Sequence, residues 1–385
     1  MVALKLSCRH ESVLKSEIRS MSLECERVGG INLSQGVCDT EVPAAVRSGA
    51  KEAMDAGVNC YTRHEGLDEL RKAIAAKQHR LRGMAVDPDG EVIVSAGATG
   101  AFYCACLALL DPGDEVILFE PFYGYHASTL VAAGAVPAFV RMTPPDWSFS
   151  AERLEAACGP RTRGLVINTP ANPSGKVFSR RELGLLADFA QAHDLFVFTD
   201  EIYEHFVYDG AEHLSPATFP GMRERTITIS GFSKTFSITG WRVGYSICDS
   251  GWAQTVGNFN DLVYVCAPAP LQMGVARGLA ALDDEFYRGI AAEYLRKRDL
   301  TCAALAAAGL QPFIPQGAYY VLADIARLPG TGSKEKAMHL LQTAGVACVP
   351  GQAFYHDGAG ETLARFCFAK QDQVLEEACR RLRRL

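Results

Sequence analysis

The sequence lacks an excess of basic residues. Its 385 residues include 38 Lys and Arg against 44 Asp and Glu, a formal net charge of −6. Nucleic-acid binding depends largely on clustered Lys and Arg side chains, so this balance gives no indication of a nucleic-acid partner. No apolar run reaches membrane-spanning length, and no membrane partner is expected either. An anionic ligand would therefore need a local site.

The sequence also lacks paired cysteines. The 13 cysteines are scattered, no CxxC pair occurs, and the spacing of Cys104 and Cys106 matches no usual zinc pattern. The N-terminal region has no apolar signal segment and instead carries several acidic residues, namely Glu11, Glu17, Glu24 and Glu26. These absences predict a cytoplasmic protein with reduced thiols and no metal.

The sequence does contain the alternation of strand-like and helical segments that is typical of an open α/β sheet. Between Glu91 and Tyr245, short apolar runs alternate with helical or loop segments. Nearly continuous apolar runs are typical of strands buried on both faces. We expect six such strands, beginning at Glu91, Asp114, Gly164, Leu195, Thr226 and Val243, and between them helical or loop segments beginning at Ala98, Tyr123, Arg180 and Ala211.

The pattern changes after Pro268. A long helical stretch, Ala269 to Ala308, is followed by short strands around 319–323 and 365–369 and by a charged closing helix. This predicts a second, smaller α+β domain, on which an N-terminal helix over 13–28 packs. The predicted divisions are an N-terminal segment 1–44, a large domain 45–270 and a small domain 271–385.

The motif SGFSKTFSITGWRVGY, Ser230 to Tyr245, is the most informative stretch. It places Lys234 directly after a predicted strand and Arg242 shortly beyond. A lysine becomes a useful nucleophile where desolvation or a neighbouring cation lowers the pKa of its amine. Such a lysine is what pyridoxal phosphate requires for a Schiff base. A solvated surface lysine is the alternative interpretation.

Other candidates follow the carboxyl ends of predicted strands, where ligands gather in open α/β sheets. Gly97, Ala98 and Thr99 leave one strand and begin a helix, so their backbone N–H groups favour an anion. Asp200 ends another strand, where an N-cap aspartate is the alternative interpretation. Tyr203, in TDEIYE, and Asn172, in NTPANPSGK, are further candidates. Tyr203 could instead be a core aromatic residue, and Asn172 could instead be a turn residue.

With these motifs in order along almost the whole chain, the sequence resembles the fold type I pyridoxal-phosphate aminotransferases. The resemblance is to the class I/II branch that contains the aspartate, aromatic and kynurenine aminotransferases. It implies an α/β fold with a large domain, in which helices sandwich a mostly parallel seven-stranded sheet. A smaller α+β domain, built from the C-terminal part and the N-terminal segment, completes the implied fold.

The resemblance also implies roles around the cofactor ring. Lys234 would form the Schiff base and later act as the base, and Asp200 would pair with the pyridine nitrogen. Tyr203 and Asn172 would bind the phenolic oxygen of the cofactor. Tyr123, in EPFYGY, would stack on the ring, with a packed core tyrosine as the alternative.

For the phosphate, the resemblance implies Gly97, Ala98, Thr99 and Arg242, together with Ser230 or Ser233. Gly231 occupies a position that is often serine in the family, so which hydroxyl serves stays open. Tyr61 matches a tyrosine that reaches the partner's phosphate, which implies a homodimer. Arg365, in RFCFA, matches the arginine that binds the substrate's α-carboxylate. A structural arginine paired with a surface acid is its alternative. Gly36 matches a segment that closes over the substrate.

The implied reaction is transfer of an α-amino group from an L-amino acid to a 2-oxo acid by a ping-pong mechanism. A pyridoxal-phosphate β-lyase or elimination enzyme, and a non-catalytic cofactor-binding regulatory protein, are the alternatives. The sequence does not identify the substrate. Arg63 could bind an acidic side chain or lie in a solvated loop next to His64, and Cys38 stands where many relatives have proline.

Overall fold

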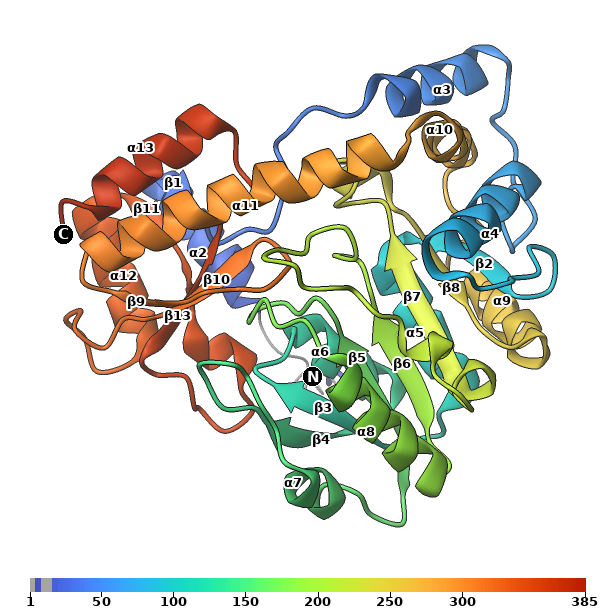
Figure 1. The fold of residues 1–385 in the computed structure, drawn as a ribbon, viewed down its shortest axis with the longest axis horizontal. Helices are drawn as coiled ribbons and strands as arrows, with labels where there is room; N and C mark the ends of the chain where they lie inside the picture. The colour runs from blue at the N-terminus through green and yellow to red at the C-terminus, as the bar shows by residue number, and fades with distance from the viewer. Residues whose placement is uncertain (1–3, 8–15) are drawn as a thin grey trace.

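The computed structural model describes residues 4–7 and 16–385, and its largest feature is a seven-stranded sheet (Figure 1). The strand order is β2-β8-β7-β6-β5-β3-β4. Strand β8 runs antiparallel to both of its neighbours, and all other pairs are parallel. The strands are β2 (Val92–Ala96), β3 (Glu115–Glu120), β4 (Val136–Arg141), β5 (Thr162–Asn168), β6 (Phe196–Asp200), β7 (Thr226–Gly231) and β8 (Val243–Ile247).

The six strands predicted from apolar runs are all present, and the structure adds β4. Strand β4 lies at the edge of the sheet, where it pairs only with β3. Val136 is 46% exposed and Pro137 interrupts the run. An edge strand is buried less than a central one and tolerates proline, so its apolar signal is weak.

Helices cover both faces of this sheet because successive side chains of a strand point to opposite faces. Val116 and Leu118 of β3 pack in the cluster under α5 (Gly97–Leu109), α6 (Gly124–Ala133) and α9 (Ser250–Tyr264). Ile117 and Phe119 pack on the opposite face, against α8 (Arg180–Ala192) and the short α7 (Ala151–Ala156). At the β2 and β8 end, that face is covered by α3 (Ala44–Asp55), α4 (Asp68–Arg82) and α10 (Ala269–Ala281).

A smaller α+β unit stands beside the large sheet (Figure 1). Its antiparallel sheet has the order β12-β13-β10-β9, and a two-residue parallel pair joins β1 to β11. The strands are β1 (Ile31–Asn32), β9 (Gln311–Phe313), β10 (Tyr320–Asp324), β11 (Val346–Ala347), β12 (Val349–Pro350) and β13 (Leu363–Cys367). The helices are α2 (Glu17–Arg27), α11 (Asp284–Ala307), α12 (Ser333–Ala344) and α13 (Asp372–Leu382).

The N-terminal segment packs with the C-terminal part, as expected. Met21 and Cys25 of α2 share a core cluster with Leu305 of α11, Leu340 of α12 and Leu382 of α13. In Figure 1 the blue α2 lies among the orange and red elements of the small unit. The helix predicted over 13–28 is present from Glu17, and residues 13–15 lie outside the described part of the chain.

The prediction of one helix over 269–308 is wrong. Helix α10 ends at Ala281, and α11 starts at Asp284, with Asp283 as its N-cap. The Asp283 carboxylate accepts hydrogen bonds from the backbone N–H groups of Glu285 and Phe286, which stabilises the new helix start. The boundaries at 44 and 270 stay predictions, and the second falls within α10.

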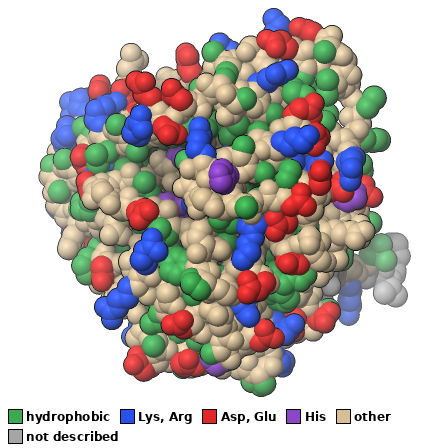
Figure 2. All heavy atoms as spheres, turned by 45° about the vertical axis from the view of Figure 1, so that its right-hand side comes forward, with side chains coloured by type: hydrophobic (Ala, Val, Ile, Leu, Met, Phe, Trp, Pro, Cys, Tyr) green, Lys and Arg blue, Asp and Glu red, His purple; other side chains and the backbone are tan. Residues whose placement is uncertain are grey.

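The surface shows no single dominant charge on the face drawn in Figure 2, where Lys and Arg side chains stand among Asp and Glu. Within residues 4–7 and 16–385, no helix is both long enough and apolar enough to span a membrane. The same residues contain no cluster of His, Cys, Asp and Glu able to hold a metal ion.

Candidate active site

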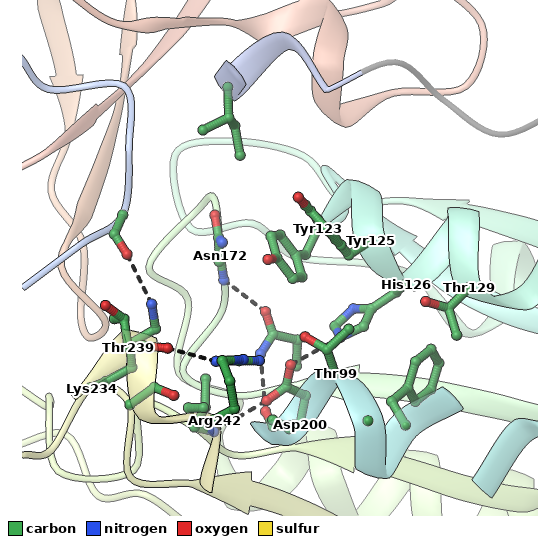
Figure 3. Close-up of a pocket in the computed structure, with 18 of the residues that line it drawn as sticks. Thr99, Tyr123, Tyr125, His126, Thr129, Asn172, Asp200, Lys234, Thr239 and Arg242 are labelled. Carbon is green, nitrogen blue, oxygen red and sulfur yellow. Dashed lines mark hydrogen bonds and ion pairs between the residues drawn. The ribbon is translucent and has the colours of Figure 1, made fainter. Parts of the chain in front are cut away.

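One cavity of about 720 Å³ collects most of the predicted site residues. Lys234, Asp200, Arg242, Asn172 and Tyr123 point into the same space (Figure 3). The cavity opens at the edge where β2, β5, β6 and β7 end. Other predicted residues that line it are Gly36, Ala98, Thr99, Tyr203, Ser233 and Arg365.

Lys234 follows β7 by three residues and extends its side chain into this cavity. Its Nζ donates a hydrogen bond to the carbonyl oxygen of Gly36 at 2.9 Å and lies 5.5 Å from the centre of the Tyr319 ring. The Tyr319 hydroxyl donates to the same carbonyl at 3.1 Å. Burial lowers the pKa of the Lys234 amine, and the nearby cations of Arg365 and Arg242 lower it further.

This lowered pKa predicts a pH-dependent contribution to stability. Below the folded-state pKa of Lys234, the folded and unfolded states are both protonated and the folded state carries the full cost of the buried charge. As pH rises from that pKa toward the ordinary value of 10.5, the cost disappears. We therefore expect the unfolding free energy of the ligand-free wild type to gain on that of Lys234→Met across this window in urea titrations. A constant difference would contradict the lowered pKa.

Asp200, at the end of β6, is held by groups on both of its oxygens. His126 Nε2 lies 2.9 Å from Oδ2, and the backbone N–H of Ile202 donates to Oδ1 at 3.2 Å. Asp200 is the only acidic side chain that lines the cavity among the described residues. Sequence reasoning missed His126, although it follows Tyr123 by one turn of a predicted helical segment.

Arg365 lies in the middle of β13 and is fully buried. Its Nη1 donates to Asn172 Oδ1 at 2.8 Å, and its Nη2 donates to the Ser34 carbonyl. The guanidinium carbon lies 4.2 Å from the centre of the Tyr320 ring. No acid pairs with it among the described residues, and its buried Nε has no partner there. An arginine left without a counter-charge at a cavity wall is suited to bind a carboxylate.

Two further tyrosines, Tyr203 and Tyr320, line the same cavity. The hydroxyls of Tyr203 and Tyr320 lie 3.1 Å apart. Burial holds the pKa of Tyr203 well above its ordinary value, so the phenol stays neutral and can donate a hydrogen bond. The Tyr123 ring meets His126 edge-on at 5.3 Å and stacks on Tyr125 at 5.2 Å.

At the predicted phosphate site, two glycines allow neighbouring groups to come very close to the backbone. Gly97 begins α5 at φ +73°, and a Cβ on it would lie 2.3 Å from Arg242 Nη2. A Cβ on Gly244 would lie 2.5 Å from the backbone nitrogen of Ala98. These two glycines let the Arg242 guanidinium and the first N–H groups of α5 face the same space, which favours an anion.

Three of the predicted site residues do not line the cavity, namely Gly97 at the start of α5, Ser230 and Tyr61. Ser230 does not line the cavity: it is buried in β7, and its hydroxyl lies within hydrogen-bond distance of the Glu201 carbonyl and Glu204 Oε1. Ser230 lies inside the buried strand, whereas Ser233 stands beyond its end, and of these two serines it is Ser233 that lines the cavity. Tyr61 is 82% exposed and lies outside the cavity.

The structure also gives the positions of Arg63, His64 and Cys38, to which the sequence assigned no role. Arg63 is 70% exposed at its side chain and pairs with Glu65, which His64 also contacts. Cys38 is buried, and its Sγ lies 3.7 Å from the backbone oxygen of Lys234. Neither Arg63 nor His64 lines the cavity of this chain, whereas Arg19, on α2, does.

Comparisons with known proteins agree with this geometry. The family "Aminotransferase class I and II" matches residues 28–382. The solved N-succinyldiaminopimelate aminotransferase of Mycobacterium tuberculosis is similar at 37% identity and TM-score 0.95, covering 98% of this chain and 99% of that one. A methionine aminotransferase structure from Escherichia coli has TM-score 0.95 at 32% identity over the full length of both chains. Kynurenine–oxoglutarate transaminase 3 of Rattus norvegicus is 34% identical, over 90% of this chain and 83% of its own. The chain therefore belongs to the class I and II aminotransferase family and is a transaminase.

Proposed function

We propose that this transaminase uses pyridoxal 5′-phosphate to move the α-amino group of an L-amino acid to a 2-oxo acid in two half-reactions. The observation that carries the proposal is the convergence in one cavity of a buried amine, a carboxylate and a guanidinium that pairs with no carboxylate among the described residues. Lys234, Asp200 and Arg242 supply these groups. Asp200 is the last residue of β6, Lys234 follows β7 and Arg242 precedes β8, so one sheet fixes their spacing.

The residues present fit the cofactor. The phosphate would lie in the corner beside Gly97, where a Cβ would collide with the Arg242 guanidinium. It would be held there by Arg242, Ala98, Thr99 and Ser233. Asp200 would hold the ring nitrogen, and His126 keeps that carboxylate in place. Asn172 and Tyr203 would bind the ring oxygen, and Tyr123 would stack on the ring. When bound, the cofactor supplies an electrophilic carbon and an acceptor for the electrons of a substrate bond.

Lys234 would hold and move the proton. Its lowered pKa increases the fraction of neutral amine at ordinary pH, so Nζ can take the proton from the substrate Cα and return it to a neighbouring atom. The Gly36 carbonyl, which Nζ already contacts, limits where the amine can point. Lys234 would thus serve both as the anchor of the cofactor and as the base.

Arg365 and Asn172 would bind and orient the substrate. The guanidinium can donate to an α-carboxylate while Asn172 and Ser34 keep it fixed. A substrate held in this way presents one bond at Cα to the Lys234 amine, and that geometry selects proton removal. Because one product must leave before the second substrate enters the same cavity, ping-pong kinetics follow. The names of the relatives differ in their amino donors, so they do not specify the donor here.

An absorbance spectrum of the protein with pyridoxal phosphate tests the proposal. Single amino acids are added without an oxo acid, beginning with glutamate, aspartate, methionine and an aromatic amino acid. We expect the long-wavelength band to move to shorter wavelength with the true donor, with release of one equivalent of oxo acid. Continued release of oxo acid and ammonia with an unchanged band would instead establish a β-lyase.

We also propose a homodimer in which Tyr61 of each subunit reaches the other's phosphate corner. The support is that Tyr61 is exposed and outside its own cavity, and that Leu262 and Val263 of α9 are exposed apolar side chains at 78% and 44%, of which Val263 lines the cavity. Such apolar exposure is typical of a surface that another protein covers.

Shared sites make a sharp prediction for mixed subunits. Lys234→Ala and Tyr61→Ala each impair a site, but in a hybrid dimer both changes fall in one site and leave the other intact. Random mixing of the two variants should restore about a quarter of wild-type activity. Activity that stays at the sum of the separate variants would show that Tyr61 serves its own subunit or no site.

We infer a cytoplasmic location. The cysteines of the described residues are all free thiols, and most are buried. Cysteine-rich chains without disulfides are typical of reducing compartments. No further partner is proposed: amino acids and 2-oxo acids are the expected ligands.

A further inference from the structure

The cavity contains one cationic side chain that the proposed function does not use. Lys234 contacts Gly36, Arg242 Nη1 donates to the Thr239 carbonyl, and Arg365 is bonded to Asn172. Arg19 lines the same cavity, and its guanidinium forms no ion pair or hydrogen bond with any residue that the structure describes. A cationic side chain free of partners beside a substrate cavity can bind an anion without breaking an existing pair.

The position of Arg19 is fixed by the contacts of α2. Ser16 caps the helix by accepting from the Arg19 backbone N–H at 3.4 Å. On the opposite side, Glu17 pairs with Lys334 of α12, and Met21 is fully buried in the core of the small unit. These contacts set the rotation of the helix, so Ile18 and Arg19 line this cavity, whereas Glu17 lines only the adjoining cavity described below, where its charge is paired with Lys334.

Arg365, which is fully buried in the small sheet, and Arg19, which is exposed on α2, both line the cavity. A ligand whose α-carboxylate lies on Arg365 would, in this proposal, extend its side chain toward α2. The wall there is formed by Ile18, Tyr103 and Tyr125, which also line an adjoining, mainly apolar cavity of about 270 Å³. These walls suit methylene groups, and Arg19 suits a negative charge at their end.

We propose that Arg19 is a specificity-determining residue that binds the distal carboxylate of a dicarboxylic substrate such as glutamate or 2-oxoglutarate. The inference rests on the proposed function, because it takes Arg365 as the site of the α-carboxylate. Of the arginines that line the cavity, Arg365 binds the α-carboxylate and Arg19 binds the distal carboxylate. Because Arg19 is exposed, its charge stays hydrated when an apolar side chain enters instead, and such substrates are not rejected.

Binding of two small acids tests the proposal without turnover. Glutarate has two carboxylates and pentanoate has one on a chain of the same carbon number, and both lack an amino group. We expect calorimetric titration of the cofactor-loaded wild type to show a clear preference for glutarate. Arg19→Gln should weaken glutarate binding about 10- to 100-fold and leave pentanoate within about twofold. Because the site is exposed, the wild-type preference should shrink as salt is raised.

Two further variants make the test specific. Arg27 lies on the last turn of the same helix, pairs with Glu24 and does not line the cavity, so Arg27→Gln should leave both affinities unchanged. Arg63 stands close in sequence to Tyr61, in the loop proposed to reach the partner. Loss of the glutarate preference in Arg63→Gln, with Arg19→Gln unaffected, would overturn the proposal. Equal weakening of both acids by Arg19→Gln would overturn it as well.

Turnover separates a failure of this inference from a failure of the proposed function. With 2-oxoglutarate as acceptor, Arg19→Gln should lose about 10- to 100-fold in kcat/KM, mainly through KM, whereas with 2-oxohexanoate it should match the wild type. If the wild type transfers an amino group to neither acceptor, the proposed function fails. If it transfers to both and Arg19→Gln loses nothing on 2-oxoglutarate, only the role of Arg19 fails.

Discussion

Replacing Lys234 by alanine is expected to lower kcat for amino transfer by about 10⁵-fold or more, the largest effect of any single change in this protein. The side chain is proposed to anchor the cofactor and to move the Cα proton, and a residue with two roles in one catalytic unit leaves little activity when it is removed. The neighbouring side chains offer no second amine, because Lys234 is the only lysine that lines the cavity among the described residues.

The measurement is kcat in a coupled assay, together with retention of the cofactor after borohydride reduction and denaturation. Wild type should retain the cofactor covalently and Lys234→Ala should not. Lys72, an exposed lysine paired with Asp68, provides a matched control whose alanine variant should behave as wild type in both measurements. Partial recovery of Lys234→Ala activity by added methylamine would show that the variant is folded. Full activity without an added amine would refute the assignment.

Replacing Asp200 by asparagine is expected to lower kcat by about 10³-fold. The change keeps the size of the side chain and its contact with Ile202, but it removes the only negative charge that lines the cavity in the described chain. A carboxylate opposite the proposed ring nitrogen stabilises the charge that develops as the Cα proton leaves, so its loss should act on kcat more than on KM.

Glu120 provides the matched control for Asp200. It is also a buried carboxylate at the end of a strand of the same sheet, but it pairs with Arg141 and His356 and does not line the cavity. Glu120→Gln is made in parallel, and the two variants are compared by kcat and by thermal melting. Comparable losses of kcat in the two variants would mean that the effect of Asp200→Asn is a general cost of removing a buried charge.

The fold was largely predictable because its central strands are buried on both faces. In the run TITI, residues 226–229 of β7, every side chain is β-branched and buried. The edge strand β4 gave no such signal, since Val136 is half exposed. The division of 269–308 into two helices depends on a capping contact of Asp283, which a helical pattern alone does not reveal.

The site residues that stand in a recognisable sequence motif were predictable. Those brought to the cavity only by packing between distant parts of the chain were not. Lys234, Arg242 and Asp200 stand in recognisable stretches next to strands. His126 acts through a contact with Asp200 that spans separate elements of the chain, and Arg19 reaches the cavity only because α2 packs on the small unit. The choice between Ser230 and Ser233 stayed open because the sequence did not show that β7 ends at Gly231, between the two serines.

The residues proposed to hold the cofactor and the arginines proposed to select the substrate lie on different units of the fold, so evolution can change them independently. The antiparallel direction of strand β8 helps to gather the cofactor residues on one unit. Because β8 starts at the edge where β7 ends, Lys234 and Arg242 bracket a single loop, and the distance between the two ends of the proposed cofactor is set within one sheet. The two arginines proposed to bind the carboxylates of the substrate, Arg365 and Arg19, come instead from the small unit, and Asn172 of the large unit keeps Arg365 in place. Mutations that alter substrate choice can therefore accumulate on one unit while the apparatus for the reaction itself stays unchanged on the other.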